Sequence, residues 1–201
     1  MMNRVKQSGL KYFLVAVFSM LIIPLTSAAT PSTSGDKLAA DAKKQIGVTV
    51  NYDPAYRKIE FPRGDVPKNT GRAADVIIRA YRLQNIDLQQ LVNVDMQENW
   101  AVYPKLWDLE SPDKNIDHRR VPNLETFFER HGQSLSTTDK ESFEAGDIVT
   151  WRLTDGNKPH IGIVSNKKAA DGTPLIIHNI DEGTREENIL FKYPIRKHFR
   201  Y

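Results

Sequence analysis

Two histidines lie where neighbouring strands are predicted, and their spacing could support proton transfer. His160 falls within residues 159–164 and His178 within residues 175–179, two segments with the period-two alternation typical of strands. If they pair as a hairpin with an even register, both imidazoles lie on one sheet face, diagonal to each other, with Gly162 opposite His178. One imidazole could then take a proton while the second orients it, as a thiol nucleophile requires.

A helix that precedes these strands could supply the rest of such a site. Asn69 or Thr70 is predicted to cap it, and Arg72, Arg79 and Arg82 are predicted to face outward or toward partners. The amides at a helix N-terminus lower the pKa of a thiol. The chain contains no cysteine, however. The predicted buried face of this helix comprises Ala73, Val76, Ile77 and Ala80.

Three further helices are predicted from the spacing of apolar residues. The first covers residues 36–46 and ends at Gly47. The second is capped by Asp87, and the third begins at Asn123 and stops at Gly132. The apolar stripe of the second helix comprises Leu88, Leu91, Val92 and Met96.

Strand patterns dominate the C-terminal part of the chain. Residues 48–67 are predicted to form an extended loop because they contain three prolines and a turn at Gly64. After Gly146 the hydrophobic pattern alternates, which predicts antiparallel strands joined by hairpins. The order of elements therefore predicts an α+β fold, with N-terminal helices packed on one face of an antiparallel β-sheet.

The first 29 residues have the features of an export signal. A basic start is followed by an apolar run over 12–23, which is short and ends in Pro24 and small residues. We therefore expect a signal peptide over 1–29, one domain over 30–201, and a periplasmic or secreted protein. No stable membrane span is expected after cleavage, because no second apolar stretch follows.

Composition limits the possible partners. The chain has 28 Lys and Arg against 25 Asp and Glu, and the leader holds three of the basic residues, so the remainder has 25 of each. Nucleic-acid binding usually needs a clustered basic face, so none is expected. No disulfide can staple the fold, and hydrophobic burial must stabilise it.

From about Ala40 to Tyr201 the chain resembles the bacterial domain-of-unknown-function family numbered 1287. That family is similar to the NlpC-type cell-wall peptidases of the papain-like clan, and the resemblance implies a papain-like fold without a cofactor or metal. The segments that carry the resemblance are 47–54 (GVTVNYDP), 62–67 (PRGDVP), 115–123 (NIDHRRVPN), 146–151 (GDIVTW) and 159–164 (PHIGIV).

The resemblance implies a nucleophile at position 73, a base at His160 and an orienting residue at His178. Family members have cysteine where this chain has Ala73, and a methyl group cannot attack a carbonyl. Either Ala73 was introduced to trap an inactive protein, or a natural relative kept the fold and lost the reaction. Alanine also suits a buried helical turn without any function. The alternative for the two histidines is that they are half-buried strand residues satisfied by their neighbours, but their shared face and the resemblance favour a functional role.

Further residues are candidates for binding a substrate. Tyr52 could donate a hydrogen bond to the reacting carbonyl, with Tyr56 as an equal rival. Asp75 either stabilises the helix N-terminus or belongs to the site. Arg119 and Arg120 belong either to a solvated charged loop with His118 or to a site for the carboxylates of an acidic peptide. A metal held by His160, His178 and Asp75 matches no compact ligand motif.

The sequence thus predicts an exported cysteine amidase or endopeptidase scaffold whose substrate is a peptidoglycan peptide or a related amide. With Ala73 in place, the chain is expected to bind without cutting. One rival hypothesis is a non-catalytic periplasmic protein that binds a cell-wall peptide or a protein partner. Another is an acyltransferase of the same clan.

Overall fold

The computed structural model describes residues 35–153 and 157–201, which belong to one compact unit. The predicted signal peptide over 1–29 lies outside the described residues. In chain order the elements are α1 (Gly35–Lys43), β1 (Asn51–Tyr52), β2 (Thr70–Gly71), α2 (Ala73–Leu83), α3 (Leu88–Glu98), η1 (Trp100–Val102), η2 (Asp117–Arg119), α4 (Val121–His131), β3 (Gln133–Ser134), η3 (Lys140–Ser142), β4 (Ile148–Leu153), β5 (Lys158–Lys168), β6 (Pro174–Asn179), β7 (Thr184–Glu187) and β8 (Ile195–Arg200).

Six strands form one antiparallel sheet in the order β3-β8-β4-β5-β6-β7. Hydrophobic alternation predicted the four central strands, β4, β5, β6 and β8. The edge strands β3 and β7 were not predicted. The sequence of β7 is Thr-Arg-Glu-Glu, which has no apolar alternation, so only its pairing with β6 makes it a strand.

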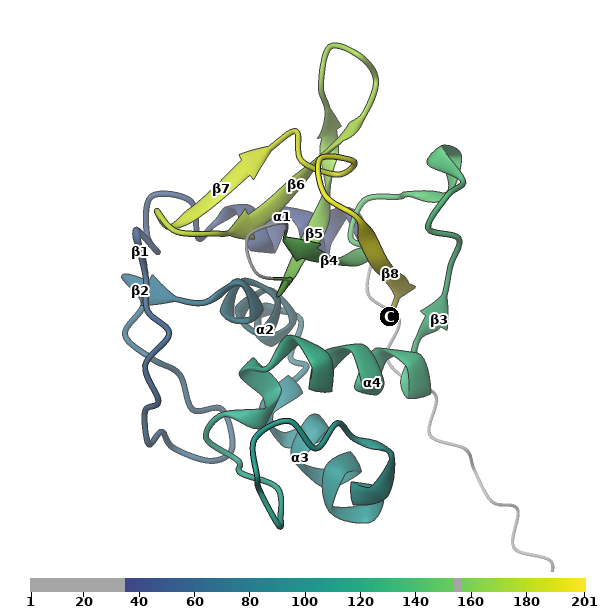
Figure 1. Ribbon diagram of the computed structural model, residues 1–201. Coiled ribbons are helices and arrows are strands. Elements are labelled where there is room, and N and C mark those ends of the chain that lie inside the picture. Colours follow the sequence, from purple (N-terminus) through teal and green to yellow (C-terminus); the bar gives the residue numbers. More distant parts are fainter. Residues whose placement is uncertain (1–34, 154–156) are drawn as a thin grey trace, which may run out of the picture. The chain divides into compact units, whose positions relative to one another are not determined.

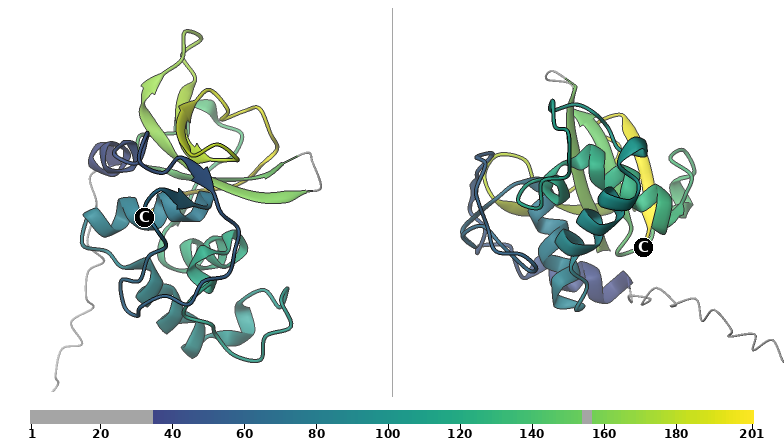
Figure 2. Two further views of the ribbon diagram at one scale, coloured as in Figure 1. Left: turned by 90° about the vertical axis from the view of Figure 1, so that its left-hand side faces the viewer. Right: turned by 90° about the horizontal axis from the view of Figure 1, so that it is seen from below.

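Three helices, α1, α2 and α4, pack on one face of the sheet, whereas α3 packs on α2 and α4. Figure 1 shows α2 and α4 against the strands with α3 beyond them, and the left view of Figure 2 shows the helices below the strands again. The predicted α+β arrangement is confirmed. The core on this face joins apolar side chains of the helices to Ile148, Ile161, Ile163, Ile177 and Phe199 of the sheet.

The opposite face of the sheet is also buried. The segment between β7 and β8 lies over it, and the indole Nε1 of Trp151 donates a hydrogen bond to the carbonyl oxygen of Leu190 over 2.9 Å. Because both faces are covered, the central strands carry apolar residues on each side. The second core comprises Phe143, Val149, Trp151, Val164, Ile176, Ile189 and Leu190.

The cap of α2 is Arg72, which lies two residues after Thr70 and three after Asn69, the two predicted caps. Residues Thr70 and Gly71 are extended because they pair with β1 as the parallel strand β2. The helix therefore starts at Ala73, and the Asp75 carboxylate accepts a hydrogen bond from the Arg72 amide over 2.6 Å. This bond satisfies one of the amides that a helix N-terminus leaves free.

The other helices follow the predictions with shifted ends. The first ends at Lys43 and continues as turns to Gly47, whose φ is +76°. Asp87 caps α3 as predicted, but Leu91 on that helix is 39% exposed, so its place in the buried stripe was wrong. Helix α4 begins at Val121 instead of Asn123, because a proline fits the first turn of a helix.

Residues 35–153 and 157–201 include no helix with the length and apolar character that crossing a membrane requires.

Candidate functional site

The first residue of α2 is Ala73, and two strand contacts fix its surroundings. The short parallel pair aligns Tyr52 with Gly71, two residues before the helix. From the main sheet, the Asn179 side-chain amide donates a hydrogen bond to the Gly71 carbonyl oxygen over 3.1 Å. The helix start is therefore tied both to the Tyr52 strand and to the end of β6.

The two histidines contact each other on the sheet. Nε2 of His160 lies 3.3 Å from Nδ1 of His178, and the rings stand at 90° with centroids 5.2 Å apart. The register that aligns Ile163 with Ile177 places Gly162 beside His178, as the even-register hairpin predicted. The prediction that both imidazoles share one sheet face is confirmed.

A third side chain, Glu187 of β7, lies next to His178 and forms a row with the two histidines. Its carboxylate oxygen Oε2 lies 2.9 Å from Nε2 of His178. Sequence analysis did not predict this contact, because β7 has no strand pattern from which its pairing could be foreseen. The row therefore runs from Glu187 through His178 to His160.

Burial keeps both imidazoles neutral at neutral pH. It lowers the pKa of His160 to about 3, with a further contribution from His178. Burial also lowers the pKa of His178 to about 4, although the nearby Glu187 carboxylate opposes this shift. A neutral imidazole has one nitrogen that can accept a proton, which is the state that a general base needs.

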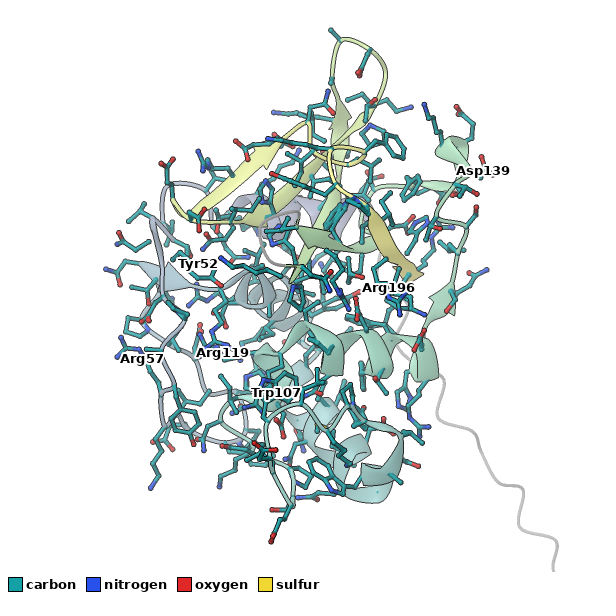
Figure 3. All side chains as sticks on the ribbon, viewed as in Figure 1. Tyr52, Arg57, Trp107, Arg119, Asp139 and Arg196 are labelled. Carbon is teal, nitrogen blue, oxygen red and sulfur yellow. The ribbon has the colours of Figure 1, made fainter. Side chains whose placement is uncertain are left out.

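Ala73 and His160 both line a cleft of about 610 Å³, whereas His178 lies behind His160 and does not line it. Tyr52, Trp107 and Arg119 line the same cleft, and Figure 3 shows these three on the side of the structure away from Asp139. The structure thus brings Ala73, the predicted nucleophile position, and His160, the predicted base, to one cavity.

Tyr52 and Tyr56 both line the cleft, but their hydroxyl groups differ in availability. The Tyr56 hydroxyl donates to Asp113 and accepts from Asn115, each over 3.0 Å. Within the described residues the Tyr52 hydroxyl makes no hydrogen bond, and burial raises its pKa. Tyr52 is therefore the tyrosine with a free donor.

Asp75 and Arg119 form a buried ion pair. The Arg119 Nε and Nη2 atoms lie 2.8 and 2.9 Å from the two Asp75 oxygens, and Asp75 is not part of the cleft wall. The alternative of a solvated loop was wrong, because Arg119 is 3% and His118 2% exposed within η2. Nη1 of Arg119 is buried and has no hydrogen-bond partner among the described residues.

Arg120 lines the cleft beside Arg119. Its Nη1 atom donates to Asp117 over 2.9 Å, and its guanidinium carbon lies 4.0 Å from the centroid of the Trp107 ring. The described part of the cleft wall is mainly basic, with four basic residues and one acidic residue. They are Arg72, Arg119, Arg120 and Lys158, against Asp181.

The described residues include no group of three or more His, Asp or Glu side chains that could hold a metal ion. Asp75, the third ligand considered with the two histidines, has both oxygens engaged by Arg119.

Comparisons with known proteins agree with the resemblance noted in the sequence. Residues 39–201 match the family described as "Domain of unknown function (DUF1287)". The chain is 50% identical over 180 residues to "Uncharacterized protein YijF" of Escherichia coli (strain K12), covering 89% of this chain and 87% of that protein.

A solved structure, "Structure of NlpC1 from Trichomonas vaginalis", is similar with a TM-score of 0.47 and 15% sequence identity. The match covers 87% of this chain but 46% of that one, so this chain spans about half the length of the solved protein. The family match and the relative at 50% identity together show that the chain belongs to the DUF1287 family.

Proposed function

We propose that the cleft is the reaction site of a thiol-dependent amide hydrolase scaffold, which in this chain binds its ligand without cutting it. The observation that carries the proposal is that Ala73, the first residue of α2, and the neutral, buried His160 line one cleft. A sulfur atom at position 73 would meet the amino end of a helix and a base in the same cavity. Both features activate a thiol.

In a form of the chain with cysteine at position 73, the thiol proton would pass to Nδ1 of His160. The thiolate would attack an amide carbonyl carbon, and the Tyr52 hydroxyl could stabilise the resulting oxyanion. His160 would then protonate the departing amine, which leaves a thioester. A water molecule that gives its proton to His160 would hydrolyse the thioester and restore the thiol.

The charge of the cleft supports an acidic peptide as the ligand. Arg120 and Lys158 line the wall together with Arg119, whose buried Nη1 atom has no hydrogen-bond partner among the described residues. A guanidinium binds carboxylates with directed hydrogen bonds. A peptidoglycan stem peptide, which carries carboxylates and amide bonds, has this chemistry, and an exported protein would encounter it. The basic wall is less suited to the acyl chain of a lipid substrate.

The test is to restore the thiol. Ala73→Cys should release soluble fragments from purified peptidoglycan sacculi, as detected by chromatography and mass spectrometry. Ala73→Cys combined with His160→Ala should release none. Ala74→Cys is the matched control, because it adds a thiol to the same turn of α2 one position away.

Three outcomes separate the hypotheses. Fragment release by Ala73→Cys alone supports a hydrolase scaffold. Sedimentation of the chain with sacculi, without release by folded Ala73→Cys, favours the non-catalytic binding protein. A folded Ala73→Cys that neither releases fragments nor sediments with sacculi rejects peptidoglycan as the ligand.

A further inference from the structure

The row of three side chains spans the distance between the solvent and the cleft. At its outer end the Glu187 side chain is 39% exposed, and next to it the His178 side chain is 1% exposed. At its inner end His160 lines the cleft. The two contacts that join them measure 2.9 Å and 3.3 Å.

The Glu187 carboxylate determines which ring nitrogens of His178 and His160 carry a hydrogen. An ionised carboxylate only accepts hydrogen bonds, so Nε2 of His178 must donate to Glu187. In a neutral ring the other nitrogen is then unprotonated, so Nδ1 of His178 accepts from Nε2 of His160. This leaves Nδ1 of His160 unprotonated, and within the described residues it makes no hydrogen bond.

We propose that Glu187 is a positioning residue that fixes the tautomers of both imidazoles through these contacts, so that His160 presents an unprotonated Nδ1 to the cleft. The consequence for catalysis rests on the proposed function, whereas the tautomers can be measured in the chain as it is. With the opposite tautomers, Nδ1 of His160 would carry a hydrogen and could not accept a proton. A wrong tautomer of the catalytic histidine is severely damaging in serine proteases.

Charged neighbours of the row provide a control. Arg185 lies 3.9 Å from Oε1 of Glu187 and 3.0 Å from Oε2 of Glu182. Lys192 also acts on His178 through its charge. Glu182 therefore shares Arg185 with Glu187, but its side chain is 76% exposed, and among the described residues it forms no hydrogen bond or ion pair with His178. Glu182→Gln changes the local charge as Glu187→Gln does and leaves the row intact.

The first experiment measures the ring nitrogens of His160 and His178 by ¹⁵N NMR at neutral pH. In the unaltered chain, His160 should have an unprotonated Nδ1 and a protonated Nε2. In Glu187→Gln, whose amide can donate or accept, signals of the opposite tautomer should appear at both rings. Glu187→Asp should restore the original tautomers, at least in part, and Glu182→Gln should not change them.

The second experiment uses the thiol of Ala73→Cys and needs no substrate. At pH 6 iodoacetamide should alkylate Ala73→Cys faster than Ala74→Cys, because the unprotonated Nδ1 of His160 can accept the proton of a thiol at position 73. Adding Glu187→Gln should slow the reaction at that pH at least tenfold, whereas adding Glu182→Gln should have little effect.

Unchanged ring signals in both Glu187→Gln and Glu187→Ala, with the fold retained by circular dichroism, would overturn the proposal. A protonated Nδ1 on His160 in the unaltered chain would also overturn it. If the tautomers respond to Glu187 but Ala73→Cys releases nothing from sacculi, the positioning role stands and the proposed function fails, so the two failures are distinguishable.

Discussion

Arg119 holds both carboxylate oxygens of Asp75, at 2.8 Å from Nε and 2.9 Å from Nη2, and both side chains are buried. Burial alone would raise the pKa of Asp75, but the hydrogen bond and charge of Arg119 outweigh it, so the pKa is lowered. The same carboxylate accepts from the Arg72 amide at the start of α2. One ion pair therefore joins the helix start to the cleft wall.

Asp75→Ala should lower the free energy of unfolding by about 3–5 kcal/mol, because it leaves the Arg119 charge buried without a partner. Urea denaturation measures the change. The matched control is Asp53→Ala, which breaks the exposed pair with Arg57 and should change the free energy of unfolding far less, because solvent screens that pair. Equal losses for the two variants would contradict the structural role of the buried pair.

A second carboxylate, Asp95, should make stability depend on pH. Burial would raise its pKa, but hydrogen bonds from Arg130, Tyr103 and His131 lower it to about 2, below its ordinary value of 3.8. A carboxyl whose pKa is lower in the folded state stabilises the fold above its ordinary pKa, and this contribution is lost as the pH falls through the folded pKa. The expected window is therefore from about pH 4 to about pH 2.

The test for Asp95 is urea denaturation across that window. Asp95→Asn should reduce the loss of stability on acidification, whereas Asp139→Asn, at an exposed position, should not. Tyr103→Phe should lower the free energy of unfolding at neutral pH by about 1.5–3 kcal/mol, because it removes a hydrogen bond to a charged group. A pH profile that Asp95→Asn leaves unchanged would refute this assignment.

Gly162 has no side chain, and this allows Ile176 and His178 to pack closely against its backbone. A Cβ atom there would lie 2.6 Å from Cγ2 of Ile176 and 3.3 Å from Cβ of His178. Gly162→Ala should therefore cost about 1–3 kcal/mol through overpacking, and it should shift the ring signals of His178 in NMR spectra. Lys167→Ala, at an exposed position of the same strand, serves as the control. Native stability together with unshifted His178 signals would argue against the close fit.

The Asn179 side chain links the end of β6 to strand β2 through its hydrogen bond to Gly71. Asn179→Ala should cost about 0.5–1.5 kcal/mol, because it removes a buried hydrogen bond and leaves the Gly71 carbonyl oxygen with only the Asp53 amide as a donor. In the Ala73→Cys background it should also slow alkylation by iodoacetamide, since the helix start loses its link to the histidine strands. Asn166→Ala removes an exposed amide that accepts from Lys43 and should change neither quantity. If both substitutions behave alike, the link has no role in positioning.

The histidine pair was predictable because strand alternation is a local property. Two segments of alternating sequence, separated by a short turn, indicate a hairpin, and an even register places His160 and His178 on one face. The cap of α2 was placed two or three residues too early, at Thr70 or Asn69, for the opposite reason. Thr70 is a good capping residue by type, but it is held extended by residues 51–52, a contact that no local pattern reveals.

The sequence alone determined the α+β class, the shared face of the two histidines and the absence of a thiol, because composition and hydrophobic period depend on residues close together in the chain. Only the tertiary structure decided that Glu187 contacts His178 and that Arg119 binds Asp75. It alone also showed that, within the part of the chain that the structure describes, the Tyr56 hydroxyl is hydrogen-bonded and the Tyr52 hydroxyl is not. These contacts join side chains from separate elements. Their geometry follows from strand pairing and packing, which the spacing of residues does not encode locally.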